Sequence, residues 1–176
     1  MLIKICGINH EDTLLCCEEN NVDFFGMIFY PKSPRNISIE NASKLNKISE
    51  KLNINGVGVF VNKNINELEE IIKFVNLKYV QLHGSEDKLY IKNVKKFGVT
   101  IIKSISVSNK DDLKKINDYK NADYFLFDYK PKKNELPGGN SKSFNWNVLK
   151  NLKTDKPWFL SGGININNIQ QILVDI

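Results

Sequence analysis

Short apolar runs alternate with amphipathic segments along the whole 176-residue chain, and this repeat limits the fold more than any other feature. The runs are rich in β-branched and aromatic residues, as buried strands are, and the segments between them place apolar residues about 3.6 apart, as helices do. Strands separated by helices pair in parallel, because a parallel pair needs a long crossover. The pattern predicts a single α/β domain over residues 1–176.

The repeat predicts the following strands: Leu2–Cys6, Asp23–Phe29, Gly56–Val61, Lys78–His83, Val99–Ile105, Asp123–Asp128 and Trp158–Ser161. Between and after them it predicts helices at Glu11–Asn20, Glu40–Leu52, Ile65–Asn76, Asp87–Phe97, Lys110–Tyr119, Asn145–Leu152 and Asn165–Val174. Two architectures fit such a repeat, an open doubly wound sheet and a (β/α)₈ TIM barrel. The first is disfavoured because "CGIN" follows the first strand in place of a G-x-G-x-x-G turn.

The barrel interpretation makes a second prediction, because barrel active sites are built at the carboxyl ends of the strands. Chemically useful residues from distant parts of the sequence fall at such ends, namely Cys6, His83, Asp128 and the segment Ser161 to Gly163. We therefore expect a (β/α)₈ TIM barrel, represented here by about seven strand-helix units, whose site contains these residues.

Cys6 ends the first strand, and two interpretations of it compete. A free cysteine most often packs as a small apolar side chain. At the mouth of a barrel it can instead act as a nucleophile or a base, and Lys4, about 7 Å away along the same strand face, would favour its thiolate. The other cysteines, Cys16 and Cys17, have neither metal-ligand nor disulfide spacing, so free thiols are expected.

Asp128 and Arg35 are the charged candidates. Asp128 closes "YFLFD", where it can be an ordinary cap residue or a proton donor, since apolar surroundings favour the protonated carboxyl. Arg35 follows the second strand in "FYPKSPRNIS", where a guanidinium can be merely solvated or can pair with a substrate carboxylate. For His83, a hydrogen-bonded residue at a strand end is the simpler interpretation, and no chemical role is assigned to it.

Two glycine pairs are candidate phosphate contacts. In "FLSGGIN", Gly162 and Gly163 separate a strand from a helix, so backbone N–H groups can approach an anion at the helix start. In "LPGGNSKSFNW", Gly138 and Gly139 lie in a loop that can be a mobile flap or a plain connector.

Composition narrows the classes of partner. The net charge is +5, but the lysines alternate with acidic residues and no nucleic-acid-binding motif accompanies them, so we expect no nucleic acid. No apolar run is long enough for a membrane span and the chain starts without a signal-peptide pattern, so we expect a cytoplasmic protein with no membrane contact.

The ordered set of motifs resembles the phosphoribosylanthranilate isomerases of tryptophan biosynthesis. The motifs that carry the resemblance are "KICGIN", "GMIFYPKSPRNIS", "GVGVFVN", "VQLHG", "FLFDYK", "GGNSKSFNW" and "FLSGGIN". The resemblance implies a cofactor-independent Amadori rearrangement of N-(5'-phosphoribosyl)anthranilate, a small phosphosugar substrate, in a monomer or homodimer. It also implies that Cys6 is the general base, Asp128 the general acid, Arg35 the contact of the anthranilate carboxylate, and Gly138, Gly139, Gly162 and Gly163 the phosphate-binding residues.

The sequence departs from the family pattern in two places. The loop after the sixth strand commonly reads Gly-Gly-Ser/Thr-Gly in the family, whereas Asn140 and Ser141 follow the glycine pair here. The family also has an eighth strand-helix unit, which we interpret as missing from this sequence. The alternative functions are another phosphosugar-handling barrel enzyme and a truncated or degenerate barrel that binds phosphate without turnover.

Overall fold

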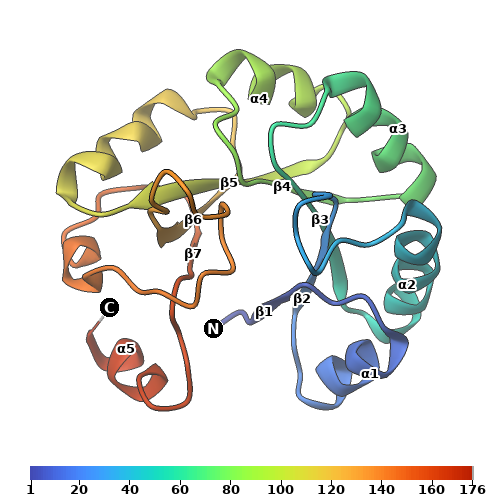
Figure 1. Cartoon of the computed structure of the whole chain (residues 1–176), viewed down its shortest axis with the longest axis horizontal. Coiled ribbons are helices and arrows are strands. Elements are labelled where there is room, and N and C mark those ends of the chain that lie inside the picture. Colours follow the sequence, from blue (N-terminus) through green and yellow to red (C-terminus); the bar gives the residue numbers. More distant parts are fainter. Residues whose placement is uncertain (176) are drawn as a thin grey trace.

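Seven parallel strands form one curved sheet in the order β1-β2-β3-β4-β5-β6-β7, so each strand pairs with its neighbours in sequence. The computed structural model describes residues 1–175. In Figure 1 the strands lie inside a ring of helices, and β1 and β7 are the two ends of the curled sheet. Within residues 1–175 neither of these edge strands has a second strand partner. The predicted TIM-barrel-like α/β fold is confirmed.

The elements, in chain order, are β1 Lys4–Cys6, α1 Glu11–Glu19, β2 Phe24–Ile28, α2 Ile39–Leu52, β3 Asn55–Phe60, α3 Ile65–Val75, β4 Tyr79–Leu82, α4 Lys88–Lys95, β5 Thr100–Val107, η1 Lys110–Asp118, β6 Tyr124–Tyr129, η2 Trp146–Leu149, β7 Trp158–Leu160 and α5 Ile169–Asp175. Two of the predicted helices, η1 and η2, are 3₁₀ helices. Asp112 is the one buried residue of η1, so this segment packs little apolar surface against the sheet, and η2 has four residues, about one turn. The last helix begins at Ile169, four residues later than predicted.

Strand alternation divides the core into two parts. One face of the sheet looks into the barrel, where a small cluster forms from Phe24, Ile28, Val57, Val59, Ile102 and Leu126. The opposite face packs against the helices and contributes to the larger cluster, which includes Phe25, Leu68, Ile91 and Phe127. Since burying such a side chain contributes about 1.5–3 kcal/mol, the helix layer supplies most of the apolar stabilisation.

The same alternation decides which polar residues enter the barrel. Residues i and i+2 of a strand share a face. Tyr79 and Leu126 belong to the interior cluster, so Gln81 and His83 follow Tyr79 inward and Asp128 follows Leu126 inward. The interior is therefore apolar at depth and polar at the carboxyl ends of the strands, which is where a site can form.

Candidate active site

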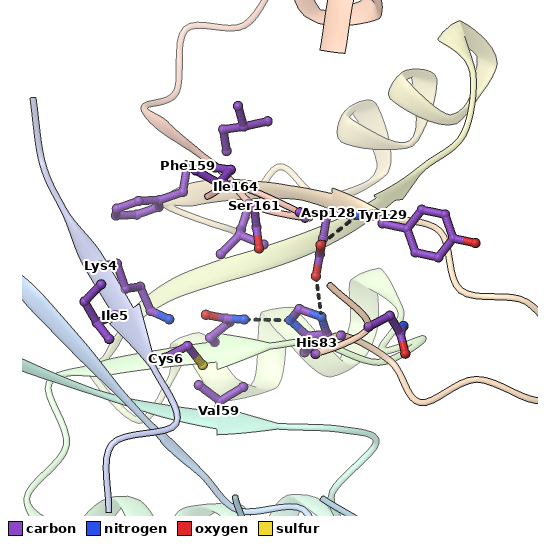
Figure 2. Close-up of a pocket in the computed structure, with 18 of the residues that line it drawn as sticks. Lys4, Ile5, Cys6, Val59, His83, Asp128, Tyr129, Phe159, Ser161 and Ile164 are labelled. Atoms are coloured by element: carbon purple, nitrogen blue, oxygen red, sulfur yellow. Dashed lines mark hydrogen bonds and ion pairs between the residues drawn. The ribbon is translucent and has the colours of Figure 1, made fainter. Parts of the chain in front are cut away.

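Cys6 and Lys4 point into the barrel from β1 and share a small space beside β2. Cys6 pairs in register with Gly26, which has no side chain to occupy that space. A Cβ atom at Gly26 would lie 2.9 Å from Cys6 Sγ and 3.1 Å from Lys4 Nζ, so both groups lie over this glycine. Figure 2 shows both side chains directed into the same cavity. The ammonium and the thiol are thus neighbours, as the strand alternation predicted.

Asp128 lies across the cavity on β6, and it is buried. Its Oδ1 accepts a hydrogen bond from the backbone N–H of Tyr129 at 2.8 Å, which orients the carboxyl group. Its Oδ2 lies 3.3 Å from Nε2 of His83. Figure 2 shows this pair on the side of the cavity opposite Cys6. A thiol and a carboxyl group therefore face each other across one space, a suitable arrangement for a base and an acid.

His83 is held by a second contact that the sequence did not suggest. Its Nδ1 lies 2.6 Å from Nε2 of Gln81, the inward-facing residue two positions earlier. Gln81 is buried, and the other atom of its amide, Oε1, has no hydrogen-bond partner among residues 1–175. The spacing of Gln81 and His83 on one strand face was the available signal, but only the three-dimensional structure shows that the two side chains meet.

Arg35 crosses from the loop after β2 to the end of β1. Its Nη1 donates to the backbone oxygen of Cys6 at 2.7 Å, and its Nη2 lies 3.0 Å from where a Cβ of Gly139 would be. The side chain is exposed at the rim. A guanidinium has five N–H donors, so the bond to Cys6 leaves others for a ligand.

The glycine pair after β6 lies over the His83 and Asp128 pair. Gly138 has φ +82°, and a Cβ there would lie 2.8 Å from Nε2 of His83. Gly139 has φ +73°, so both positions need a backbone conformation that glycine adopts without strain. Ser141 adopts φ 53° although it is not glycine, so the loop keeps a left-handed conformation at the position where the sequence departs from the family pattern.

The glycine pair after β7 packs closely against Asp128. Gly162 has φ +88°, and a Cβ there would lie 2.9 Å from Asp128 Oδ1. Gly163 has φ +68° and lies equally close to the backbone of the loop after β6. The N–H groups of both glycines have no acceptor within residues 1–175. By contrast, the backbone N–H of Asn165 donates to Asn168 Oδ1 at 2.8 Å. The free backbone N–H groups of Gly162 and Gly163 therefore lie in the loop before α5.

All seven candidate site residues line one cavity of about 1190 Å³, at the carboxyl ends of the strands. Lys4, Gln81 and His83 line it as well. Apolar side chains from β1, β7 and α5 also line it, among them Ile5, Phe159 and Ile172. The structure thus brings together every residue that the sequence suggested, from five separate parts of the chain.

Two buried polar clusters support the loops around the cavity. Lys103 and Glu86 form an ion pair at 2.9 Å with both side chains 1% exposed. Glu86 lies three residues after His83, and Lys103 lies on β5. Burial lowers the pKa of Lys103 below its ordinary value, and the charge of Glu86 opposes that effect. Asp112 binds Lys130 at 2.8 Å and the N–H of Ser108 at 2.9 Å; burial alone would raise its pKa, but these hydrogen bonds lower it overall.

No helix within residues 1–175 is long and apolar enough to cross a membrane. The same residues contain no group of three or more His, Cys, Asp and Glu side chains placed to hold a metal ion.

The fold and the cavity define a class, the TIM-barrel-like α/β enzymes with a polar site at the carboxyl ends of parallel strands. The family of N-(5'-phosphoribosyl)anthranilate (PRA) isomerases matches residues 3–175. The chain belongs to this family.

Individual proteins and structures similar to this chain carry the same family name. The N-(5'-phosphoribosyl)anthranilate isomerase of Brucella canis is 38% identical over 175 residues, which are 98% of this chain and 78% of the relative. The crystal structure of phosphoribosyl anthranilate isomerase from Thermotoga maritima has a TM-score of 0.88 at 29% identity and covers 100% of this chain and 83% of that one. A further isomerase structure, in complex with reduced 1-(o-carboxyphenylamino)-1-deoxyribulose 5-phosphate, has a TM-score of 0.83 at 28% identity. The match covers 100% of this chain and 82% of that one.

Proposed function

We propose that this isomerase converts N-(5'-phosphoribosyl)anthranilate into 1-(2-carboxyphenylamino)-1-deoxyribulose 5-phosphate with Asp128 as general acid and Cys6 as general base. The observation that carries the assignment is that the two side chains enter one cavity from β6 and β1, with the Asp128 carboxyl oriented by the N–H of Tyr129 and the Cys6 thiol close to the Lys4 ammonium. An acid and a base on opposite sides of a bound sugar can act on different atoms of it.

The acid step opens the sugar ring. Asp128 in its protonated form gives a proton to the ring oxygen, the bond between that oxygen and C1' breaks, and the amine nitrogen forms a double bond to C1'. The product is an iminium ion, and Asp128 is left as a carboxylate. The N–H of Tyr129 and the imidazole of His83 lie at hydrogen-bond distance from its two oxygens and can stabilise this charge.

The base step uses the acidity that the iminium gives to C2'. The thiolate of Cys6 removes the C2' proton, and the electron pair of that C–H bond neutralises the iminium to give an enolamine. Transfer of the enol proton to C1' then gives the ketone. Solvent returns a proton to Asp128 and takes one from Cys6, so the reaction is an isomerisation with no net proton change. Lys4 supports the thiolate, because an ammonium favours a neighbouring negative charge.

Substrate binding is assigned to the rim of the cavity. Arg35 offers its remaining N–H donors to the anthranilate carboxylate, a charge-assisted contact suited to a guanidinium. The free N–H groups of Gly162 and Gly163 are donors for the phosphate, and the loop at Gly138 and Gly139 closes over the reacting atoms. In this arrangement the two charged ends of the substrate are held apart with the sugar carbons between Cys6 and Asp128.

The assignment is tested by following the loss of phosphoribosylanthranilate fluorescence with the purified protein. Removing a general acid or base costs about 10²–10⁴-fold in rate, so Cys6→Ala and Asp128→Asn should each reduce kcat by at least 100-fold. Cys16→Ala and Asp155→Asn are matched controls, since both residues are exposed and lie outside the cavity, and they should leave kcat within about twofold. Variants of Cys6 or Asp128 that keep normal turnover would refute the roles, and a folded wild-type protein without turnover would favour the phosphate-binding alternative.

A further inference from the structure

Gln81, His83 and Asp128 form a chain of contacts below the loop at Gly138. Gln81 Nε2 lies 2.6 Å from His83 Nδ1, and His83 Nε2 lies 3.3 Å from Asp128 Oδ2. The side chain of His83 is 11% exposed and that of Asp128 is 9% exposed, so little solvent competes for either nitrogen. Both nitrogens of the imidazole therefore have a protein neighbour, and these neighbours decide where the ring carries its proton.

The contact with Gln81 bears on the tautomer of His83, because the role of Nδ1 as donor or acceptor depends on which nitrogen carries the proton. An amide nitrogen is a donor only, so the nitrogen that it faces must offer a lone pair. If Nδ1 of His83 accepts from Gln81, a neutral imidazole must carry its proton on Nε2, the atom beside Asp128. His83 is then a hydrogen-bond donor to Asp128 and has no lone pair on that side with which to take a proton from it.

The unpartnered oxygen of Gln81 indicates that this contact is the reason for its orientation. Gln81 is 2% exposed, its Oε1 has no hydrogen-bond partner among residues 1–175, and His83 Nδ1 is the one group there at hydrogen-bond distance from its amide. Buried polar atoms are normally paired, and unpaired ones in native structures often have a functional reason. The side chain thus gives up one hydrogen bond and keeps the one to the imidazole.

We propose that Gln81 is a positioning residue that holds His83 as the Nε2–H tautomer, so that His83 stabilises the carboxylate of Asp128 and does not accept its proton. The proposal rests on the role of Asp128 as general acid. In that reaction the proton of Asp128 goes to the sugar ring oxygen, and His83 donates to the carboxylate that remains. With the other tautomer, Nε2 would accept the carboxyl proton and compete with the substrate for it.

The tautomer of His83 can be measured directly by ¹⁵N NMR of histidine-labelled protein, whether or not the protein turns over. The chain has two histidines, and the spectrum of His10→Gln assigns the remaining signals to His83. The wild type should show a protonated Nε2 and an unprotonated Nδ1. Gln81→Met keeps the side-chain length and removes the donor, so it should give a mixture of tautomers. Gln81→Glu presents only acceptors and should move the proton to Nδ1.

Kinetics complete the test. Gln81→Met should reduce kcat about tenfold and leave KM within about twofold, because Gln81 acts through His83 and not on the substrate. Ser104→Ala is the matched control, since Ser104 is also a buried interior residue whose hydroxyl has no partner, and it should change neither kcat nor the tautomer.

A wild-type His83 protonated on Nδ1 would overturn the proposal, as would a Gln81→Met protein with unchanged tautomer and kcat. A raised KM with unchanged kcat would make Gln81 a substrate contact and overturn it equally. If the wild type had no turnover, the proposed function would fail, and the NMR spectra alone would still decide whether Gln81 sets the tautomer.

Discussion

The buried ion pair of Lys103 and Glu86 gives the most quantitative stability prediction. Glu86 accepts from Lys103 Nζ at 2.9 Å, from the N–H of Asn62 at 2.9 Å and from the N–H of Gly84 at 3.0 Å. Lys103 also donates to the backbone oxygens of Leu82 at 3.2 Å and Gly84 at 2.8 Å. The pair thus joins β4, β5 and the loop that follows His83, with every strong partner inside the protein.

Removing one member should be expensive, because the other charge stays buried. Losing one partner of such a pair typically costs about 3–5 kcal/mol. We expect Lys103→Met and Glu86→Gln each to fall in that range, and Lys103→Met leaves a carboxylate that still receives two backbone N–H groups. The double variant should lose less than the sum of the single variants, by about 2–3 kcal/mol, since neither charge then remains unpaired.

The assay is urea unfolding of the wild type, the two single variants and the double variant at pH 7, followed by circular dichroism. Lys73→Met is a surface comparison, because Lys73 is exposed and its partner Glu69 is half-exposed, and it should change the free energy of unfolding by less than about 1 kcal/mol. Single variants of the buried pair that cost under 1 kcal/mol, or a double variant with fully additive losses, would refute the reasoning. The same variants should also reduce kcat, because the pair anchors the backbone at Gly84, next to His83.

Three further predictions concern the site and its supports. Lys4→Met should slow alkylation of Cys6 by iodoacetamide at pH 7.5 several-fold, measured by mass spectrometry, and an unchanged rate would argue against the ammonium's role. Gly138→Ala should lower kcat and cost about 1–2 kcal/mol of stability, because the new Cβ would meet His83 at a φ of +82°; Gly98→Ala, at φ +76° in open space, should cost stability alone. Asp112→Asn should destabilise the protein by about 1–2 kcal/mol at pH 7. The pKa of this group is lowered by folding, so its contribution is complete above the unfolded value of about 3.9 and is lost as the pH falls below it; a difference in unfolding free energy that grew towards acid pH would contradict this.

The repeat, the parallel sheet and the end of the barrel that carries the cavity could all be predicted from the sequence. Alternating strands and helices leave parallel pairing as the simple solution, and the carboxyl ends of parallel strands meet at one edge. Cys6 and Asp128, 122 positions apart, are therefore expected in one cavity from the sequence alone, and the structure has both in its wall. The pattern predicted helices at η1 and η2 but did not distinguish 3₁₀ from α geometry, because Asp112 is the one buried residue of η1 and η2 has only four residues.

Which side chains touch could not be predicted from the sequence, because it depends on how the folded chain packs. The two-residue period of a strand places Gln81 and His83 on one face, but it does not say that the amide reaches Nδ1 or that Nε2 reaches Asp128 on another strand. Likewise, no local signal placed Gly138 over His83 or joined Lys103 to Glu86. These contacts depend on the stagger of neighbouring strands, on loop paths and on the exclusion of water, which are properties of the packed chain and not of any segment of it.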